Sequence, residues 1–111
     1  MDSVARPPLR FGLSEAILTQ LHDTFVRFPD VEQVWLYGSR ATGTYRPQSD
    51  IDLAVSASAM TGRAFAQLWN ALDDLPIIFK LDVLHWDSAS PALRHSIALH
   101  GVVLYRRQKN D

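Results

Sequence analysis

Two aspartates separated by one residue, Asp50 and Asp52, have the type and spacing that metal chemistry requires. In an extended strand alternate side chains share a face, so both carboxylates would point one way while Ile51 and Leu53 face the core. Like charges at this spacing repel unless a cation lies between them, and carboxylate oxygens are hard ligands for Mg²⁺ or Mn²⁺. The pair therefore predicts a metal site that also binds substrate phosphates. The alternative is a turn or capping cluster after Ser49.

A glycine and a hydroxyl residue precede this pair. Gly38 and Ser39 end an apolar run, where the glycine frees the backbone to turn tightly. A short helical turn from Ser39 towards Gly43 would present free backbone N–H groups, and the Ser39 hydroxyl adds another donor for an anion. Ser39 as a helix N-cap is the other interpretation, and it is compatible with phosphate binding. A phosphate cradle beside a carboxylate pair predicts a triphosphate site.

A third carboxylate, Asp82, interrupts the apolar segment 81–84. A buried aspartate is costly without a partner, so its position indicates that it has one. If its strand neighbours the strand of Asp50 and Asp52, three carboxylates converge. Asp82 would then hold a metal and take the proton from an attacking hydroxyl. The alternative is a partly exposed strand residue.

The order of these pieces resembles a known family. Gly38-Ser39, ten intervening residues and Asp50-x-Asp52 are similar to the signature of the minimal nucleotidyltransferases, within the DNA polymerase β-like superfamily. The resemblance runs through nearly the whole chain and includes Asp82. It implies the nucleotidyltransferase fold, a small mixed β-sheet packed against helices, and a two-metal transfer of a nucleoside monophosphate.

The resemblance also assigns residue roles. The catalytic residues and metal ligands that it implies are Asp50, Asp52 and Asp82. The nucleotide-binding residues that it implies are Gly38, Ser39, Arg40 and Ser49. The cofactor would be Mg²⁺ or Mn²⁺, as two ions, and the substrate ATP. Many members carry a second basic residue where Thr42 stands here, so Arg40 is the expected phosphate-neutralising residue, with Arg46 as the other candidate.

A partner protein is implied too. Stand-alone members are paired with a separate helical protein, often of the HEPN type, and in some pairs the small enzyme is an antitoxin that adenylylates its partner. The sequence resembles the nucleotidyltransferase of such a toxin–antitoxin pair, with its acceptor hydroxyl on, or bound by, the partner. Two alternatives stay open: a non-catalytic module that masks its partner, and a small-molecule nucleotidyltransferase of the aminoglycoside type. The second is disfavoured because a chain of 111 residues has no room for an acceptor-binding helical domain.

Hydrophobic periodicity predicts the elements that must position these residues. The segments expected to be helical are 17–28, 65–72 and 91–100, and those expected to be strands are 31–37, 51–55, 77–85 and 102–105. Ser90 and Pro91 suit the start of the last helix, and Gly101 suits the left-handed position just past its end. Alternating helices and strands indicate an α/β (α+β) fold with a two- or three-layer sheet.

Length and composition are those of one domain. We expect a loose lead-in over 1–12, the nucleotidyltransferase domain over 13–105 and a solvated tail over 106–111. The formal net charge is −1, so no direct binding of nucleic acid is expected. The sequence has no cysteine, which excludes disulfides and zinc–thiolate sites. With no long apolar stretch and no signal-like start, we expect no membrane contact and a cytoplasmic protein.

The remaining chemically interesting residues are expected to be structural. The histidines show no metal-ligand spacing with a second histidine or cysteine. The tryptophans, expected in the core and not as base-stacking platforms, are Trp35, Trp69 and Trp86.

Overall fold

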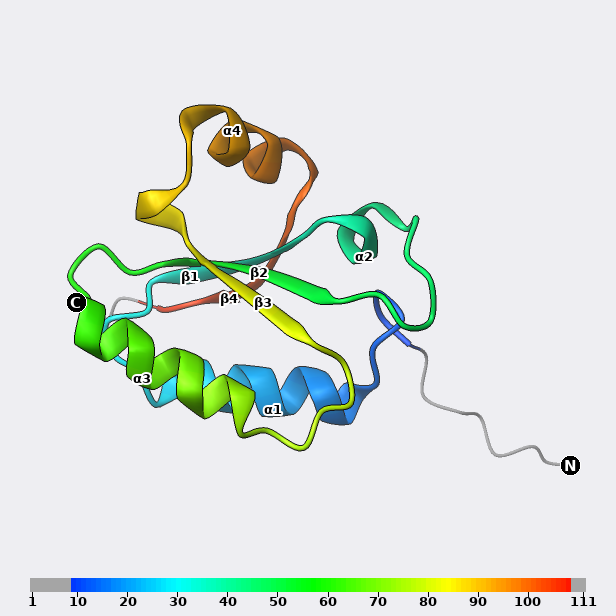
Figure 1. Ribbon diagram of the computed structural model, residues 1–111, viewed down its shortest axis with the longest axis horizontal. Coiled ribbons are helices and arrows are strands. Elements are labelled where there is room, and N and C mark those ends of the chain that lie inside the picture. Colours follow the sequence, from blue (N-terminus) through cyan, green and yellow to red (C-terminus); the bar gives the residue numbers. More distant parts are fainter. Residues whose placement is uncertain (1–8, 109–111) are drawn as a thin grey trace, which may run out of the picture.

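The computed structural model describes residues 9–108, which form one mixed β-sheet with helices on both faces (Figure 1). In chain order the elements are α1 (Glu15–Val26), β1 (Gln33–Tyr37), α2 (Ser39–Thr42), β2 (Ile51–Ser56), α3 (Gly62–Asp73), β3 (Leu81–His85), the 3₁₀ turn η1 (Trp86–Ser88), α4 (Pro91–His100) and β4 (Val102–Arg106). The strands lie in the order β3-β2-β1-β4. The α/β fold class expected from the sequence is confirmed.

Hydroxyl side chains begin the three longer helices. Ser14, Thr61 and Ser90 each accept a hydrogen bond from the backbone N–H three residues ahead, at 3.1–3.2 Å. Each bond satisfies an N–H that has no partner within its helix. Pro91 occupies the first turn of α4, as its fixed φ favours. The predicted start of this helix is confirmed.

The core lies between the sheet and the layer of α1 and α3 (Figure 1). Alternate residues of β1 and β2, among them Leu36 and Leu53, point into it and are fully buried. Phe25 of α1 and Leu68 of α3 close it from the helical side. The other face of the sheet carries α4, whose buried residue is Ile97. The catalytic candidates must therefore lie on the α4 side, since the opposite face is filled.

The sheet combines two kinds of pairing. β1 is antiparallel to both β2 and β4, whereas β2 and β3 are parallel. Parallel neighbours need a long crossover, and α3 provides it between β2 and β3. This crossover places Asp82 opposite Asp52, although thirty residues separate them in the sequence.

Two features of the elements differ from the sequence prediction. The strand expected over 77–85 begins only at Leu81, and the four residues before it form a loop. Gly101 is not left-handed but extended, with φ −76° and ψ 165°. A glycine is nevertheless needed there, because a Cβ would lie 2.5 Å from the carbonyl oxygen of Ile97 and 3.2 Å from that of Leu36. Close approach of two backbones, and not a positive φ, explains this glycine.

Some of the described residues near the two ends of the chain belong to regular structure. β4 includes Arg106, and Arg107 donates hydrogen bonds to the carbonyl oxygens of Val31 and Phe28, at 3.0 and 3.1 Å. Regular structure therefore extends into the segment expected to be a solvated tail, although Arg106 itself is exposed. The lead-in expected over 1–12 is bridged at Arg10 to Leu13. Residues 1–8 and 109–111 of the two expected terminal segments lie outside the described part.

Candidate active site

A row of three polar side chains crosses the sheet at the end next to α2. Tyr37 of β1 pairs with Asp52 of β2, and Asp52 pairs with Asp82 of β3. Residues directly opposite one another on adjacent strands project from the same face. The row thus lies on the α4 side of the sheet, opposite the core. The predicted neighbourhood of Asp52 and Asp82 is confirmed, but Asp82 is exposed, so its expected burial is wrong. Tyr37 is a member of the row that the sequence did not predict.

Gly38 follows this row and brings the backbone against Asp52. Its φ of +74° and ψ of −156° belong to a region that is essentially restricted to glycine. A Cβ at this position would overlap the Asp52 carboxylate. The glycine is therefore needed for two reasons, backbone conformation and the closeness of the acid.

The short helix α2 begins directly after Gly38. The N–H groups of Ala41 and Thr42 bond back to the carbonyl oxygen of Gly38, at 3.1 and 3.2 Å, so the N–H groups of Ser39 and Arg40 come before the first helical hydrogen bond. The expected helical turn is confirmed, and it starts beside Asp52. The N-cap position is taken by Gly38, so the interpretation of Ser39 as the N-cap is wrong.

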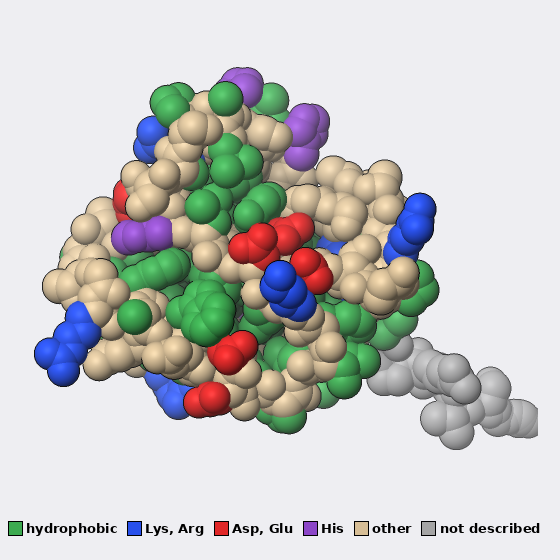
Figure 2. Space-filling model, in the orientation of Figure 1, with side chains coloured by type: hydrophobic (Ala, Val, Ile, Leu, Met, Phe, Trp, Pro, Cys, Tyr) green, Lys and Arg blue, Asp and Glu red, His purple; other side chains and the backbone are tan. Residues whose placement is uncertain are grey.

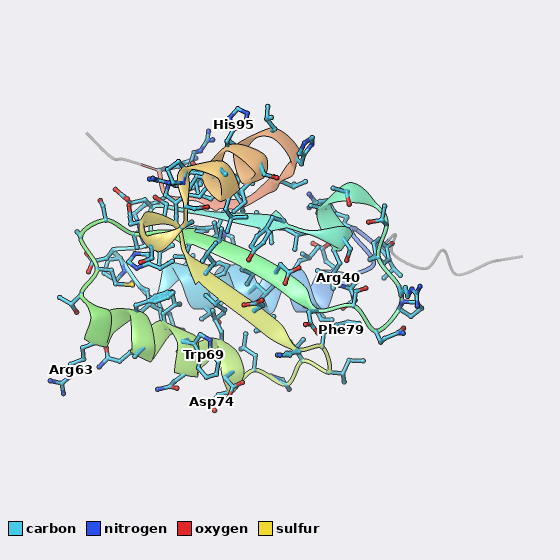
Figure 3. All side chains as sticks on the ribbon, turned by 45° about the horizontal axis from the view of Figure 1, so that its top comes forward. Arg40, Arg63, Trp69, Asp74, Phe79 and His95 are labelled. Atoms are coloured by element: carbon cyan, nitrogen blue, oxygen red, sulfur yellow. The ribbon has the colours of Figure 1, made fainter. Side chains whose placement is uncertain are left out.

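Arg40 does not extend towards the open face of the site. Its side chain is 1% exposed, and its Nε and Nη2 atoms donate to the carbonyl oxygen of Ser49, at 3.1 and 2.8 Å. Further bonds reach the carbonyl oxygens of Phe11 (3.0 Å) and Pro47 (3.4 Å). The guanidinium also lies 4.4 Å from the centre of the Phe79 ring, beside which Figure 3 shows it. Its donors are used inside the protein.

The loop that Arg40 fastens ends at the aspartate pair. Ser49 accepts the N–H of Arg46 on its hydroxyl at 2.8 Å, and its own N–H donates to the carbonyl oxygen of Arg46 at 3.0 Å. Asp50 follows in an exposed position just before β2. Asp50 and Asp52 were expected to lie on one face of the same strand. Asp52 is in β2, whereas Asp50 precedes the first residue of this strand. Figure 2 shows acidic side chains gathered on this face, between α2 and β3.

The carboxylates of Asp50, Asp52 and Asp82 are close enough to affect the pKa values of the row. Partial burial raises the pKa of the Asp52 carboxyl, and the charges of Asp82 and Asp50 raise this pKa further. Burial, with the charges of Asp82 and then Asp52, raises the pKa of Tyr37 to about 12. The Tyr37 phenol therefore stays neutral at ordinary pH. A cation next to Asp52 would relieve the repulsion that raises its pKa.

The side chains of the site are donors of the kind that divalent metals bind. Carboxylate oxygens on neighbouring strands are the ligands that Mg²⁺ prefers, and the mutual repulsion of Asp50, Asp52 and Asp82 is the electrostatic condition for binding it. Within residues 9–108, however, no three acidic, histidine or cysteine side chains are close enough together to form a metal-binding group. The donors fit in type and charge, and a bound ion would have to draw them together.

The other aromatic and histidine candidates have varied positions. Trp35 and Trp86 stack at 4.3 Å between ring centres, and both are half-buried. Trp69 is 41% exposed, so its expected core position is wrong. His85 stacks on Phe65 at 4.7 Å, a packing role as expected.

Comparisons with known proteins agree with this geometry. Residues 19–110 match the family described as polymerase beta, nucleotidyltransferase. A Haemophilus influenzae protein named probable protein adenylyltransferase MntA is 31% identical over 77 residues, which are 68% of this chain and 68% of that protein. None of the helices in residues 9–108 is long and apolar enough to cross a membrane.

Two solved structures share the fold. A crystal structure of a toxin–antitoxin with AMP-PNP aligns with a TM-score of 0.63 and 27% identity, over 82% of this chain and 74% of the other. A structure described as tri-AMPylated Shewanella oneidensis HEPN toxin in complex with MNT antitoxin aligns with a TM-score of 0.56 and 21% identity, over 81% of this chain and 73% of the other. Since the family match covers most of the chain and includes the Gly38-Ser39 turn and all three aspartates, this protein belongs to the polymerase beta nucleotidyltransferase family.

Proposed function

We propose that this chain transfers AMP from ATP to a hydroxyl group of a partner protein, and that the transfer neutralises a toxin of the HEPN type. The observation that carries the proposal is the pairing of Asp52 with Asp82 across parallel strands, beside the turn at Gly38 and Ser39. The named activity of the Haemophilus influenzae relative, protein adenylyltransferase, supports the choice of a protein acceptor. The toxin–antitoxin structure with AMP-PNP supports an adenine nucleotide.

Each residue has a distinct task in this reaction. The N–H groups at the start of α2 and the Ser39 hydroxyl bind the terminal phosphates of ATP. Asp82 accepts the proton of the acceptor hydroxyl, whose oxygen bonds to the α-phosphorus as the bond to pyrophosphate breaks. Asp50 and Asp52 would hold the divalent ions, which would neutralise the charge on the phosphoryl oxygens. Tyr37 remains a neutral hydrogen-bond donor at the edge of this row.

Arg40 acts by position and not by contact with phosphate. Its hydrogen bonds to the carbonyl oxygen of Ser49 fix the residue before Asp50, and its bond to Phe11 ties the loop to the start of the chain. A guanidinium whose donors are used in this way has little capacity left for a ligand. We therefore propose that Arg40 holds the loop between α2 and β2, which ends at Asp50. Ser49 stabilises the same loop through its hydrogen bonds with Arg46.

The test is transfer of radiolabel from α-labelled ATP to a HEPN-type partner protein in the presence of Mg²⁺. We expect label on the partner with the wild-type chain and none with Asp52→Asn. Asp30→Asn is the matched control, since it removes an exposed carboxylate in the turn before β1. An Asp52→Asn variant that labels the partner at the wild-type rate would disprove the assignment.

A non-catalytic antitoxin is the second candidate. The observation in its favour is that the carboxylates in residues 9–108 are not already gathered into a three-ligand metal group. Neutralisation of the partner by the double variant Asp50→Asn/Asp52→Asn in a growth assay would support masking. Loss of neutralisation, with binding to the partner retained, would support catalysis.

A further inference from the structure

An apolar surface lies at the edge of the sheet near the row of Tyr37, Asp52 and Asp82, which we call the catalytic row. The proposed chemistry does not use this surface. A groove of about 180 Å³ runs between α3 and the loop that leads into β3. Its apolar lining includes Trp69 and Leu72 from the helix and Ile77 and Phe79 from the loop. Ile78, at the tip of the same loop, is 91% exposed. We call this surface, formed by Trp69, Ile78 and the groove, the α3 edge.

The exposure of these side chains indicates a binding surface. Single exposed apolar residues are common, but contiguous apolar patches on a soluble domain mark places where another molecule packs. Trp69 lines the groove, and the exposed Ile78 lies in the chain between two of its lining residues, Ile77 and Phe79. Tryptophan at such a site offers a large area for contact. The groove is too small for a globular partner to enter and suits one or two side chains from a helix.

The negative charge beside the groove favours a partner that carries a basic side chain. Asp73 and Asp74 are exposed at the C-terminal end of α3, which has no basic residue in its last turn. Within residues 9–108 neither carboxylate forms an ion pair. Acidic side chains at a helix C-terminus are unfavourable next to the negative end of the helix dipole, so a cation placed there is attracted by both. Figure 3 shows Trp69 and Asp74 close together at this end of α3.

The α3 edge is also continuous with the catalytic row. Lys80 and Leu81 line the groove, and Asp82 is the next residue of β3. The Cα atoms of Lys80 and Asp82 are about 7 Å apart in an extended strand. β3 is the outermost strand on this side of the sheet, so a partner packed on the α3 edge reaches around one strand to bring a hydroxyl to Asp82.

We infer that the α3 edge docks an amphipathic helix of the acceptor protein, with apolar side chains in the groove and a basic side chain over Asp73 and Asp74. The inference rests on the proposed function, because it gives the acceptor its binding surface. It accounts for the exposure of Ile78 and Trp69 and for the acidic end of α3, whose carboxylates form no ion pair with residues 9–108. It also explains how a chain of this size selects its acceptor, by a surface next to the metal site.

The experiment measures affinity for a purified HEPN-type partner by calorimetry, and AMP transfer in the same samples. We expect Ile78→Glu to weaken binding about tenfold or more, as central apolar contacts do. Leu99→Glu is the matched control, since Leu99 is 64% exposed on α4, on the opposite face of the sheet. Both variants should keep the wild-type melting temperature and the wild-type affinity for ATP, because neither residue is in the core or the catalytic row.

A charge reversal tests the choice of occupant. Asp74→Lys should weaken binding at low salt, and the difference from wild type should shrink at high salt, whereas Asp30→Lys should bind as wild type. Wild-type affinity for both Ile78→Glu and Asp74→Lys, with transfer intact, would overturn this inference alone. Neither binding nor transfer in the wild type would reject the proposed function as well. A wild-type homodimer that Ile78→Glu disperses would show that a second copy occupies the surface, and would also overturn the inference.

Discussion

Replacing Arg40 by methionine distinguishes two roles of this residue, holding the loop between α2 and β2 and binding the phosphates of ATP. The Arg40 guanidinium lies 4.4 Å from the centre of the Phe79 ring and 5.2 Å from that of Tyr45. Methionine keeps an apolar side chain of similar length beside these rings but removes every hydrogen bond that the guanidinium donates. Three of the lost bonds are 3.1 Å or shorter, and they leave the carbonyl oxygens of Ser49 and Phe11 without this donor.

The expected loss of stability on replacing Arg40 by methionine follows from these contacts. A hydrogen bond with one charged partner contributes about 1.5–3 kcal/mol, and an unsatisfied buried acceptor costs about 1–3 kcal/mol. The removal of a buried charge offsets part of this, because the guanidinium no longer has to lose its water. We expect a net loss of about 2–4 kcal/mol, which most domains survive folded. The melting temperature should fall by about 8–16 °C, from roughly 4 °C for each kcal/mol in a domain of this size.

The assay combines thermal unfolding with steady-state kinetics of AMP transfer. If Arg40 holds the loop, Arg40→Met lowers the melting temperature and kcat, and KM for ATP changes little in the folded fraction. Arg40→Lys should recover only part of the stability, since an ammonium group lacks the planar fork that reaches two carbonyl oxygens at once. The reasoning would be refuted if Arg40→Met kept the wild-type melting temperature but strongly raised KM for ATP, and if Arg40→Lys restored the wild-type KM. Arg40 would then be assigned to phosphate binding.

Three further predictions concern the catalytic row. Gly38→Ala should lose about 1–3 kcal/mol of stability from its glycine-only backbone conformation, and almost all activity because the new Cβ displaces the Asp52 carboxylate. Urea unfolding and the transfer assay measure the two effects, and wild-type values for both would contradict the geometry. Asp52→Asn should abolish transfer yet raise the melting temperature of the metal-free protein at pH 7. The raised pKa of Asp52 means that the native state holds this proton more tightly than the unfolded chain, so wild-type stability falls as pH rises through the raised pKa, and the variant should lack this slope. Removal of metal by EDTA should stop transfer, and Mg²⁺ should raise the melting temperature of wild type but not of Asp52→Asn; a metal-independent transfer rate would argue against the carboxylate site.

Local features of the site could be predicted from the sequence. The turn at Gly38 and Ser39 and the spacing of Asp50 and Asp52 depend on neighbours in the chain, so pattern reasoning finds them. The proximity of Asp82 needed one assumption, that its strand lies beside β2, and the parallel pairing confirms it.

Features that depend on distant contacts could not be predicted. Arg40 is adjacent in sequence to the expected phosphate turn, yet Phe11, Ser49 and Phe79 surround it from three other segments. Tyr37 enters the catalytic row only through the antiparallel register with Asp52. No pattern within one strand specifies that register.

The last two discrepancies come from packing. The loop 77–80 has the apolar composition of a strand, but in the structure Ile78 points into solvent. Gly101 follows a helix, which predicts a left-handed cap. In the structure its backbone is extended, and the close passage of the Ile97 and Leu36 carbonyl groups explains why the residue is glycine.

The position of β4 has a consequence for how the protein is made. β1 lies inside the sheet, and the partner on one of its sides is the last strand of the chain, with Val34 paired to Tyr105. Contacts between residues so distant in sequence slow folding, because the chain loses much entropy before they form. During synthesis β1 therefore presents an apolar edge until β4 can pair with it. A ribosome-bound chain stopped before Val102 should be prone to aggregation, and the domain should close only after β4 has left the ribosome.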